Sequence, residues 1–265
     1  MGSIRAVFGS LILCCFMILA IAGGEISGFD PMSQDSFALL QPPSSVHYFG
    51  TDNLGRDVLS RLISGTRITL LIGVSSVAIA ASVGFLMGLL AGYRGGKFDS
   101  LMLKVMDGLF AIPSLLIVLT IVAILGSGMS SLILGVAIAN IPHFSRITRG
   151  EVLVAREASF IEALSYLGIP NEKILLIHII PAIFSAISVQ ITLRMTTAIW
   201  MESAVSFLGL GPPPPTPSWG SMISEGRAYL TLAPWISSAP GMTLSIMVFA
   251  ILLVGDALRE KYIRQ

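Results

Sequence analysis

Two ionisable side chains, Arg194 and Glu202, stand in a long apolar stretch of the sequence and are the first candidates for chemistry. Two methionines, Met195 and Met201, lie beside them within residues 182–202. An ionisable group in such a stretch normally faces a polar interior or water rather than lipid. A second interpretation stays open, in which Arg194 and Glu202 only pair with neighbouring helices or helix ends.

Sequence patterns for catalysis or metal binding are missing. The three histidines, His47, His143 and His178, form no pair at metal-ligand spacing. No G-x-x-x-x-G-K-[ST] phosphate loop occurs, so the chain does not itself hydrolyse ATP. Twelve methionines could contact a soft metal, but methionine is equally common as apolar filler. We therefore expect a protein that is not an enzyme and binds no cofactor.

The composition is that of an integral membrane protein. Only 12% of the 265 residues are charged and 54% are hydrophobic, with a mean hydropathy of +0.85, whereas soluble domains carry roughly 25% charged residues. A net charge of +1 argues against a nucleic-acid partner. Because backbone groups in lipid must be satisfied within their own segment, we predict an all-α fold with six transmembrane helices. These cover residues 6–23, 68–93, 108–126, 129–148, 182–202 and 237–255.

We expect the chain to lie in the plasma or inner membrane of the cell. The distribution of lysine and arginine predicts that both termini face the cytoplasm. In that orientation 11 of the 16 basic residues are inside. The first 24 residues also resemble a signal peptide, because Arg5 precedes an apolar run that ends in Ala20-Ile21-Ala22. We favour an uncleaved first helix, and in both cases the segment that follows is outside.

The chain is expected to divide into four parts: a first helix (1–24), an external segment (25–67), a transmembrane core (68–255) and a cytoplasmic tail (256–265). In the external segment, Asp52 or Asn53 could cap a short amphipathic helix with an apolar face formed by Leu54, Val58, Leu62 and Ile63. This helix would contact an external partner or pack on the bundle as a collar.

Three further features are placed within the core. Gly84, Gly88 and Gly92 share one helix face and predict close contact with a neighbouring helix. Pro113 is expected to kink the third span. Residues 206–220, "SFLGLGPPPPTPSWG", exclude a regular helix and are expected to form either an outer vestibule or a rigid connector.

The most informative stretch is a polar insert within residues 156–173. In "REASFIEALSYLG", Phe160, Ala163, Leu164 and Leu167 recur at helical spacing, while Glu162 faces away from them. Gly168 suits the left-handed turn after a helix, and Pro170 suits the start of a second helix. The insert therefore predicts a helix-bend-helix on the cytoplasmic face, although an ordinary interfacial loop remains open on these grounds alone.

Several motifs resemble known transport proteins. "EALSYLGIPNEKILLIHIIP" resembles the EAA motif of binding-protein-dependent ABC importer permeases, with Glu162-Ala163, Gly168 and Pro181 at the motif positions and Leu164 in place of the usual third Ala. "FGTDNLGRDVLSRLISGTRITL", "AIPSLLIVL", "SFLGLGPPPPTPSWG" and "GDALRE" resemble, in order, the second permease subunit of dipeptide, oligopeptide and nickel importers. The likeness spans roughly residues 45–260.

This resemblance implies a MetI-like permease half. Its expected partners are a sister permease, two cytoplasmic ATPase subunits that hold ATP and Mg²⁺, and an extracytoplasmic solute-binding protein. The EAA helix, with Glu162, Ala163, Leu164, Leu167 and Gly168, is expected to dock on an ATPase and couple it to the membrane helices.

Arg194, Met195, Met201 and Glu202 become candidates for the translocation path. Peptide and nickel or metal-chelate solutes stay open, and a self-contained secondary transporter is the alternative.

Overall fold

The computed structural model describes residues 2–26 and 28–263, apart from the side chains of 2–3, 24–26, 162, 165 and 261–263. This part of the chain is mostly helical, with one isolated antiparallel bridge between Thr51 and Asp57. The helices, in chain order, are α1 (Gly2–Ile26), α2 (Val58–Arg94), α3 (Gly96–Phe110), α4 (Ser114–Leu125), α5 (Met129–Arg156), α6 (Ser159–Tyr166), α7 (Asn171–Ile174), the π-helix η1 (Leu175–Ile179), α8 (Ile180–Phe207), α9 (Trp219–Gly226), the 3-10 helix η2 (Arg227–Tyr229) and α10 (Trp235–Ile263). The predicted all-α fold is confirmed.

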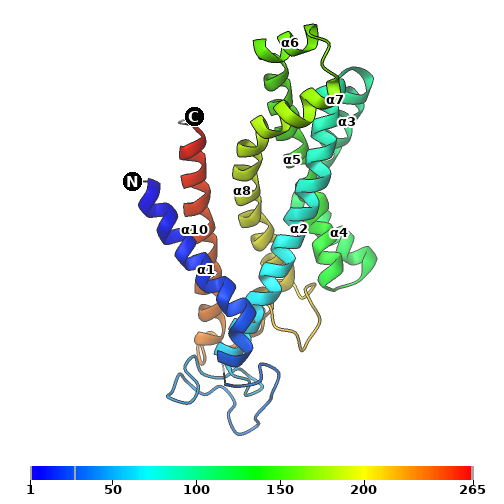
Figure 1. The fold of residues 1–265 in the computed structure, drawn as a ribbon. Coiled ribbons are helices and arrows are strands. Elements are labelled where there is room, and N and C mark those ends of the chain that lie inside the picture. Colours follow the sequence, from blue (N-terminus) through cyan, green and yellow to red (C-terminus); the bar gives the residue numbers. More distant parts are fainter. Residues whose placement is uncertain (1, 27, 264–265) are drawn as a thin grey trace.

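The long helices form an elongated bundle (Figure 1). Helices α1 and α10 lie side by side on one flank, and α2 packs against both α5 and α8. The short helices α6 and α7 lie at one end, which we call the α6 end. Residues 28–57 form the opposite end, which we call the loop end, and both chain termini point away from it.

Four segments of the described chain are long and apolar enough to cross a membrane: Ile4–Gly23, Val58–Arg94, Asn171–Phe207 and Trp235–Glu260. They contain four of the six predicted spans. The count of six is not confirmed, because one of the other two predicted spans is broken and the other is less apolar than expected.

The predicted span 108–126 is not one helix. It breaks before Pro113, and α3 and α4 meet there at 86°, so the pair counts as at most one bent span. The predicted span 129–148 lies inside α5, which is long enough to cross a membrane but less apolar than the four segments above. Asn140, His143 and Arg146 lower its hydropathy, and α5 tolerates them because it packs against α2, α4 and α8 rather than facing lipid all round.

The separate amphipathic helix expected within 25–67 is also wrong. Residues 28–57 form turns, and one uninterrupted helix of 37 residues begins at Val58. Its N-cap is Asp57 rather than Asp52 or Asn53, and the Asp57 carboxylate accepts the Ser60 amide at 2.8 Å. The apolar face around Leu62 therefore belongs to the first turns of α2.

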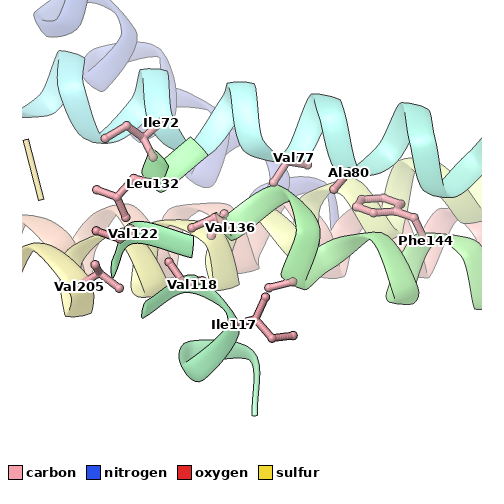
Figure 2. Close-up of a cluster of buried hydrophobic side chains, with 12 residues drawn as sticks. Ile72, Val77, Ala80, Ile117, Val118, Val122, Leu132, Val136, Phe144 and Val205 are labelled. Carbon is pink, nitrogen blue, oxygen red and sulfur yellow. The ribbon is translucent and has the colours of Figure 1, made fainter. Parts of the chain in front are cut away.

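The central core lies where α2, α4, α5 and α8 meet (Figure 2). Ile72 and Ala80 of α2 pack there with Leu132 and Val136 of α5, and all four are buried. The glycine face of α2 lies against α5 of the same chain. A Cβ at Gly88 would come within 2.3 Å of the Ser145 carbonyl oxygen, and one at Gly84 within 2.7 Å of the Ile141 oxygen. The predicted close packing is confirmed, and its partner helix is α5.

The proline-rich segment contains no helix from Leu208 to Ser218, as expected from its prolines. It leads into α9, which Ser218 and Ser221 cap reciprocally. Trp219 of α9 is fully buried and donates its indole Nε1–H to the Leu62 carbonyl at 3.0 Å. The segment and α9 are thus packed onto the bundle at the loop end.

Candidate functional site

The polar insert forms the predicted helix-bend-helix. Helix α6 ends at Tyr166, and Gly168 follows with a positive φ of 73°. The Ile169 amide bonds the Leu164 carbonyl at 3.2 Å, which is the long-range bond of a Schellman turn. Pro170 then occupies the N-cap position of α7. A left-handed residue at position 168 sets the angle between the two helices, and glycine adopts that conformation without strain.

The apolar positions of α6 divide between two faces. Phe160, Tyr166 and Leu167 are 53%, 83% and 77% exposed, and Ala163 is exposed beside them. We call these four residues the outer α6 face. Leu164 is half-buried against a core of its own chain, with Ile161 buried beside it. Of the predicted stripe, Leu164 therefore lies on the inner side, apart from Phe160, Ala163 and Leu167. The Glu162 side chain lies outside the part of the chain that the structure describes.

The inner side of α6 is fixed to the bundle. Ile161 and Leu164 pack in a cluster with Leu89 of α2, Val152 of α5 and Ile183 of α8. The cluster contains side chains from the three central helices, so α6 cannot move without disturbing them. The periodicity of the sequence did not predict this packing of α6 against the bundle.

Two polar side chains connect the same region to the last turn of α2. The Tyr93 hydroxyl donates to the Asn171 carbonyl of α7 at 3.2 Å. Arg156, at the end of α5, donates from Nη1 to the Gly92 and Tyr93 carbonyls at 2.9 and 2.8 Å. A guanidinium beside the C-terminal carbonyls of a helix also interacts favourably with the negative end of the helix dipole. These contacts join α2, α5 and α7 at the α6 end.

Helix α3 is held to α5 by two ion pairs. Arg149 forms a two-point contact with Asp99, at 2.5 Å from Nε and 2.7 Å from Nη2. Arg146 donates to Asp107 at 2.7 Å, but both side chains are more than half exposed. The two-point geometry and lower exposure of the Arg149 pair make it the stronger restraint.

Glu202 does not line an open path in this conformation. Its side chain has no exposed surface, and three hydroxyls donate to it: Ser206 at 2.9 Å, and Thr69 and Ser203 at 3.2 Å each. Glu202 therefore braces α8 against Thr69 of α2. This agrees with the open alternative that Glu202 pairs with neighbouring helices rather than facing a solute.

The other three path candidates are partly buried on α8. Met195 packs against two core clusters and Met201 against one, so both have packing roles in the chain. Arg194 differs from them, because its buried Nε lacks a hydrogen-bond partner. No ion pair of Arg194 occurs among the described residues.

A buried ion-pair network at the loop end was missed in the sequence. The Glu225 carboxylate of α9 accepts from Arg56 and Arg61 at 2.8 Å each, and Asp52 accepts from Arg56 at 2.7 Å. Asp52, Arg56 and Arg61 are almost fully buried. The four-residue spacing of Asp52 and Arg56 was a usable signal for the first pair, but nothing local to Arg61 indicates a partner 164 residues away.

Comparison with known proteins decides the class. Residues 84–264 match the family described as binding-protein-dependent transport system inner membrane component, and this is more than half of the chain. The chain belongs to this family. The permease assignment predicted from the EAA-like motif is confirmed, and members of this family are transport subunits rather than enzymes. The alternative of a self-contained secondary transporter is wrong.

Curated relatives of the permease cover almost its full length. It is 38% identical over 96% of its length, and 85% of the relative's, to the glutathione transport system permease protein GsiD of Pectobacterium atrosepticum. Identity to GsiD of Escherichia coli O6:K15:H31 is 41% over 96% of the permease and 84% of the relative. Identity to the di/tripeptide transport system permease protein DppC of Pseudomonas aeruginosa is 39% over 96% of the permease and 86% of the relative.

The fold of the permease also has solved counterparts. A chain of the inward-facing MetNI methionine ABC transporter matches 75% of the permease and 95% of its own length, with a TM-score of 0.63 at 18% identity. A second MetNI crystal form gives a TM-score of 0.59 over 76% of the permease. The predicted MetI-like fold is therefore confirmed. Together with its apolar helices, the family places the permease in a membrane, crossing it several times.

Proposed function

We propose that this permease forms one half of the translocation path of an ABC importer for short peptides, including glutathione. Its partners would be a sister permease, two cytoplasmic ATPase subunits and an extracytoplasmic binding protein. ATP and Mg²⁺ would bind in the ATPase subunits, and this chain would hold no cofactor. The observation that carries the proposal is the outer α6 face: an exposed apolar surface on a short helix whose opposite side is fixed to the bundle.

Exposed apolar side chains at the end of a bundle favour a protein partner over water. Phe160, Tyr166 and Leu167 project from a helix of only eight residues, and such a helix is too short to cross a membrane. Burying an exposed leucine or phenylalanine side chain contributes about 1.5–3 kcal/mol. Contact with an ATPase subunit would bury these groups and stabilise the complex.

The contacts behind α6 provide a route for coupling. A shift of α6 and α7 would act on α2 through Tyr93 and Arg156, and on α8 through the continuous segment Asn171–Phe207. Near the far end of α8, Glu202 connects the motion to α2, and α9 packs against the same helix. Closure of the ATPases would then change which end of the path is open, as alternating access requires.

The orientation follows from the same surface. If α6 contacts an ATPase, the α6 end is cytoplasmic. Both termini point toward that end (Figure 1), which supports the orientation expected from the basic residues, and the loop end is then outside.

For the path itself, we retain Arg194 as the candidate for solute contact. A cation within a span that lacks an ion pair in the described chain suits the carboxylate that every peptide solute carries. We assign Glu202 to bracing, and Met195 and Met201 to packing. No group of three His, Cys, Asp or Glu side chains in the described part of the chain is arranged to hold a metal ion.

Uptake by the complete transporter tests the solute. Proteoliposomes with both permeases, both ATPase subunits and the binding protein should accumulate a labelled dipeptide, tripeptide or glutathione only when ATP is present on the ATPase side. Nickel uptake without peptide uptake would overturn the solute assignment. Uptake by this chain alone would overturn the assignment to a multi-subunit importer.

A further inference from the structure

A cavity of about 440 Å³ lies between the last turns of α1 and the first turns of α2, at the loop end. Leu19 and Ile21 of α1 and Ile63 of α2 provide apolar walls, and Ser60, Ser64 and Arg67 of α2 add polar groups. The volume falls within the range of pockets that bind small molecules, roughly 300–1,000 Å³. The lining combines apolar surface with a cation and hydroxyls.

Arg67 is the charged group available to a ligand in this cavity. The two nearby arginines, Arg56 and Arg61, are already paired with acidic side chains. The Ser60 hydroxyl is also engaged, because it donates to Asp57 at 2.7 Å. The hydrogen bonds and ion pairs of the described residues include none from Arg67 or Ser64, and Arg67 is exposed.

The cavity lies at the level where two apolar runs end. In α2, Arg67 immediately precedes residues 68–93, which contain no charged side chain. In α1, the uncharged run ends at residue 24, next to the cavity-lining residues 19–23. A membrane helix leaves the hydrocarbon where its apolar run ends, so both helices place the cavity at the membrane surface.

We propose that this cavity binds the phosphate of an anionic phospholipid headgroup. The planar guanidinium of Arg67 suits a phosphate, and the Ser64 hydroxyl can donate a further hydrogen bond. An acyl chain would lie along α1, where Met17, Ile18 and Ile21 are exposed, the last at 84%. Basic pockets between membrane helices bind anionic headgroups on the cytoplasmic side of membranes, and this cavity offers the same chemistry at the opposite surface. A protein partner would not need a polar cavity that opens onto an apolar helix surface.

Lipid retention by the complete transporter tests this site. The complex would be assembled in nanodiscs of palmitoyl-oleoyl phosphatidylglycerol and phosphatidylcholine, released into detergent, and its bound lipid counted by native mass spectrometry. Arg67→Gln should lower retained phosphatidylglycerol by on the order of tenfold, because a charged hydrogen-bonding group is lost. Ser64→Leu, which keeps the charge but fills the cavity, should lower it several-fold.

Arg227→Gln is the matched control, since Arg227 is an exposed arginine at the same end of the bundle but outside the cavity. It should retain lipid as the unmodified complex does. Equal retention in Arg67→Gln and Arg227→Gln would overturn the proposal. Displacement of the lipid by millimolar inorganic phosphate would identify a site for free anions instead. Loss of the sister permease from Arg67→Gln with unchanged lipid would identify a protein contact.

Discussion

Gly88→Ala should destabilise the permease although alanine is the better helix former. In an open helix position the exchange would stabilise the chain by about 0.5–1 kcal/mol. At Gly88 the new Cβ would lie 2.3 Å from the Ser145 carbonyl oxygen and 2.8 Å from the Thr148 Cβ, both on α5. Backbone atoms of a packed helix cannot rotate away, so α2 and α5 must separate. Overpacking of this kind costs roughly 1–3 kcal/mol, which outweighs the helix-propensity gain and leaves a net loss of up to about 2.5 kcal/mol.

The assay is the thermal unfolding midpoint of the purified complex in detergent, monitored by size-exclusion chromatography after heating. About 2–4 °C is lost per kcal/mol in a chain of this size, so the midpoint should fall by several degrees. Gly150→Ala is the control, because a Cβ there meets nothing within 4 Å; it should be neutral or stabilising. A Gly88→Ala midpoint at or above that of the unmodified protein would refute the role of this seam. Loss of the sister permease at an unchanged midpoint would show that the seam lies between subunits.

Three other predictions concern single contacts. Glu225→Gln should lower the unfolding midpoint through a loss of about 1–3 kcal/mol, because Arg56 and Arg61 both lose a charged acceptor; the exposed Glu172→Gln should not, and equal midpoints would exclude a stabilising network. Asp99→Asn should loosen α3 from α5 and speed proteolysis within residues 96–110, whereas Asp107→Asn should have a smaller effect because its pair is exposed. With Cys14 and Cys15 replaced, a cysteine at Ser44 should react with an impermeant thiol reagent from outside intact cells, and one at Lys173 should not; the reverse result would invert the orientation.

The helix-bend-helix was predictable because its signals are local. Apolar spacing, Gly168 and Pro170 lie within a dozen residues and determine α6, the turn and α7. The division of the apolar positions between an outer and an inner face was not predictable. Leu164 and Leu167 have the same chemistry, and only the packing of α2, α5 and α8 behind Leu164 separates them.

The errors have physical causes of the same kind. Asp52 and Asp57 are equally good caps from sequence, and the ion pair of Asp52 with Arg56 leaves the cap position to Asp57. Pro113 was expected to kink a helix, but it stands at the N-cap of α4 with an extended ψ of 129°. Because a proline disfavours helical geometry in the residue before it, α3 ends at Phe110 and α4 starts anew at 86° to it. Glu202 looked like a path residue because its partner hydroxyl on Thr69 is 133 residues away in sequence.

The most direct test of the coupling role is solute-stimulated ATP hydrolysis by the reconstituted complex with its binding protein. Leu167→Asp places a charge on the outer α6 face without entering the core, so the chain should fold with an unchanged unfolding midpoint. Burying a charged carboxylate in a desolvated contact costs roughly several kcal/mol. Stimulated hydrolysis and uptake should therefore fall at least tenfold. Leu167→Met, which keeps the surface apolar, should retain both activities. Full stimulation and uptake in Leu167→Asp would contradict docking of an ATPase on this face.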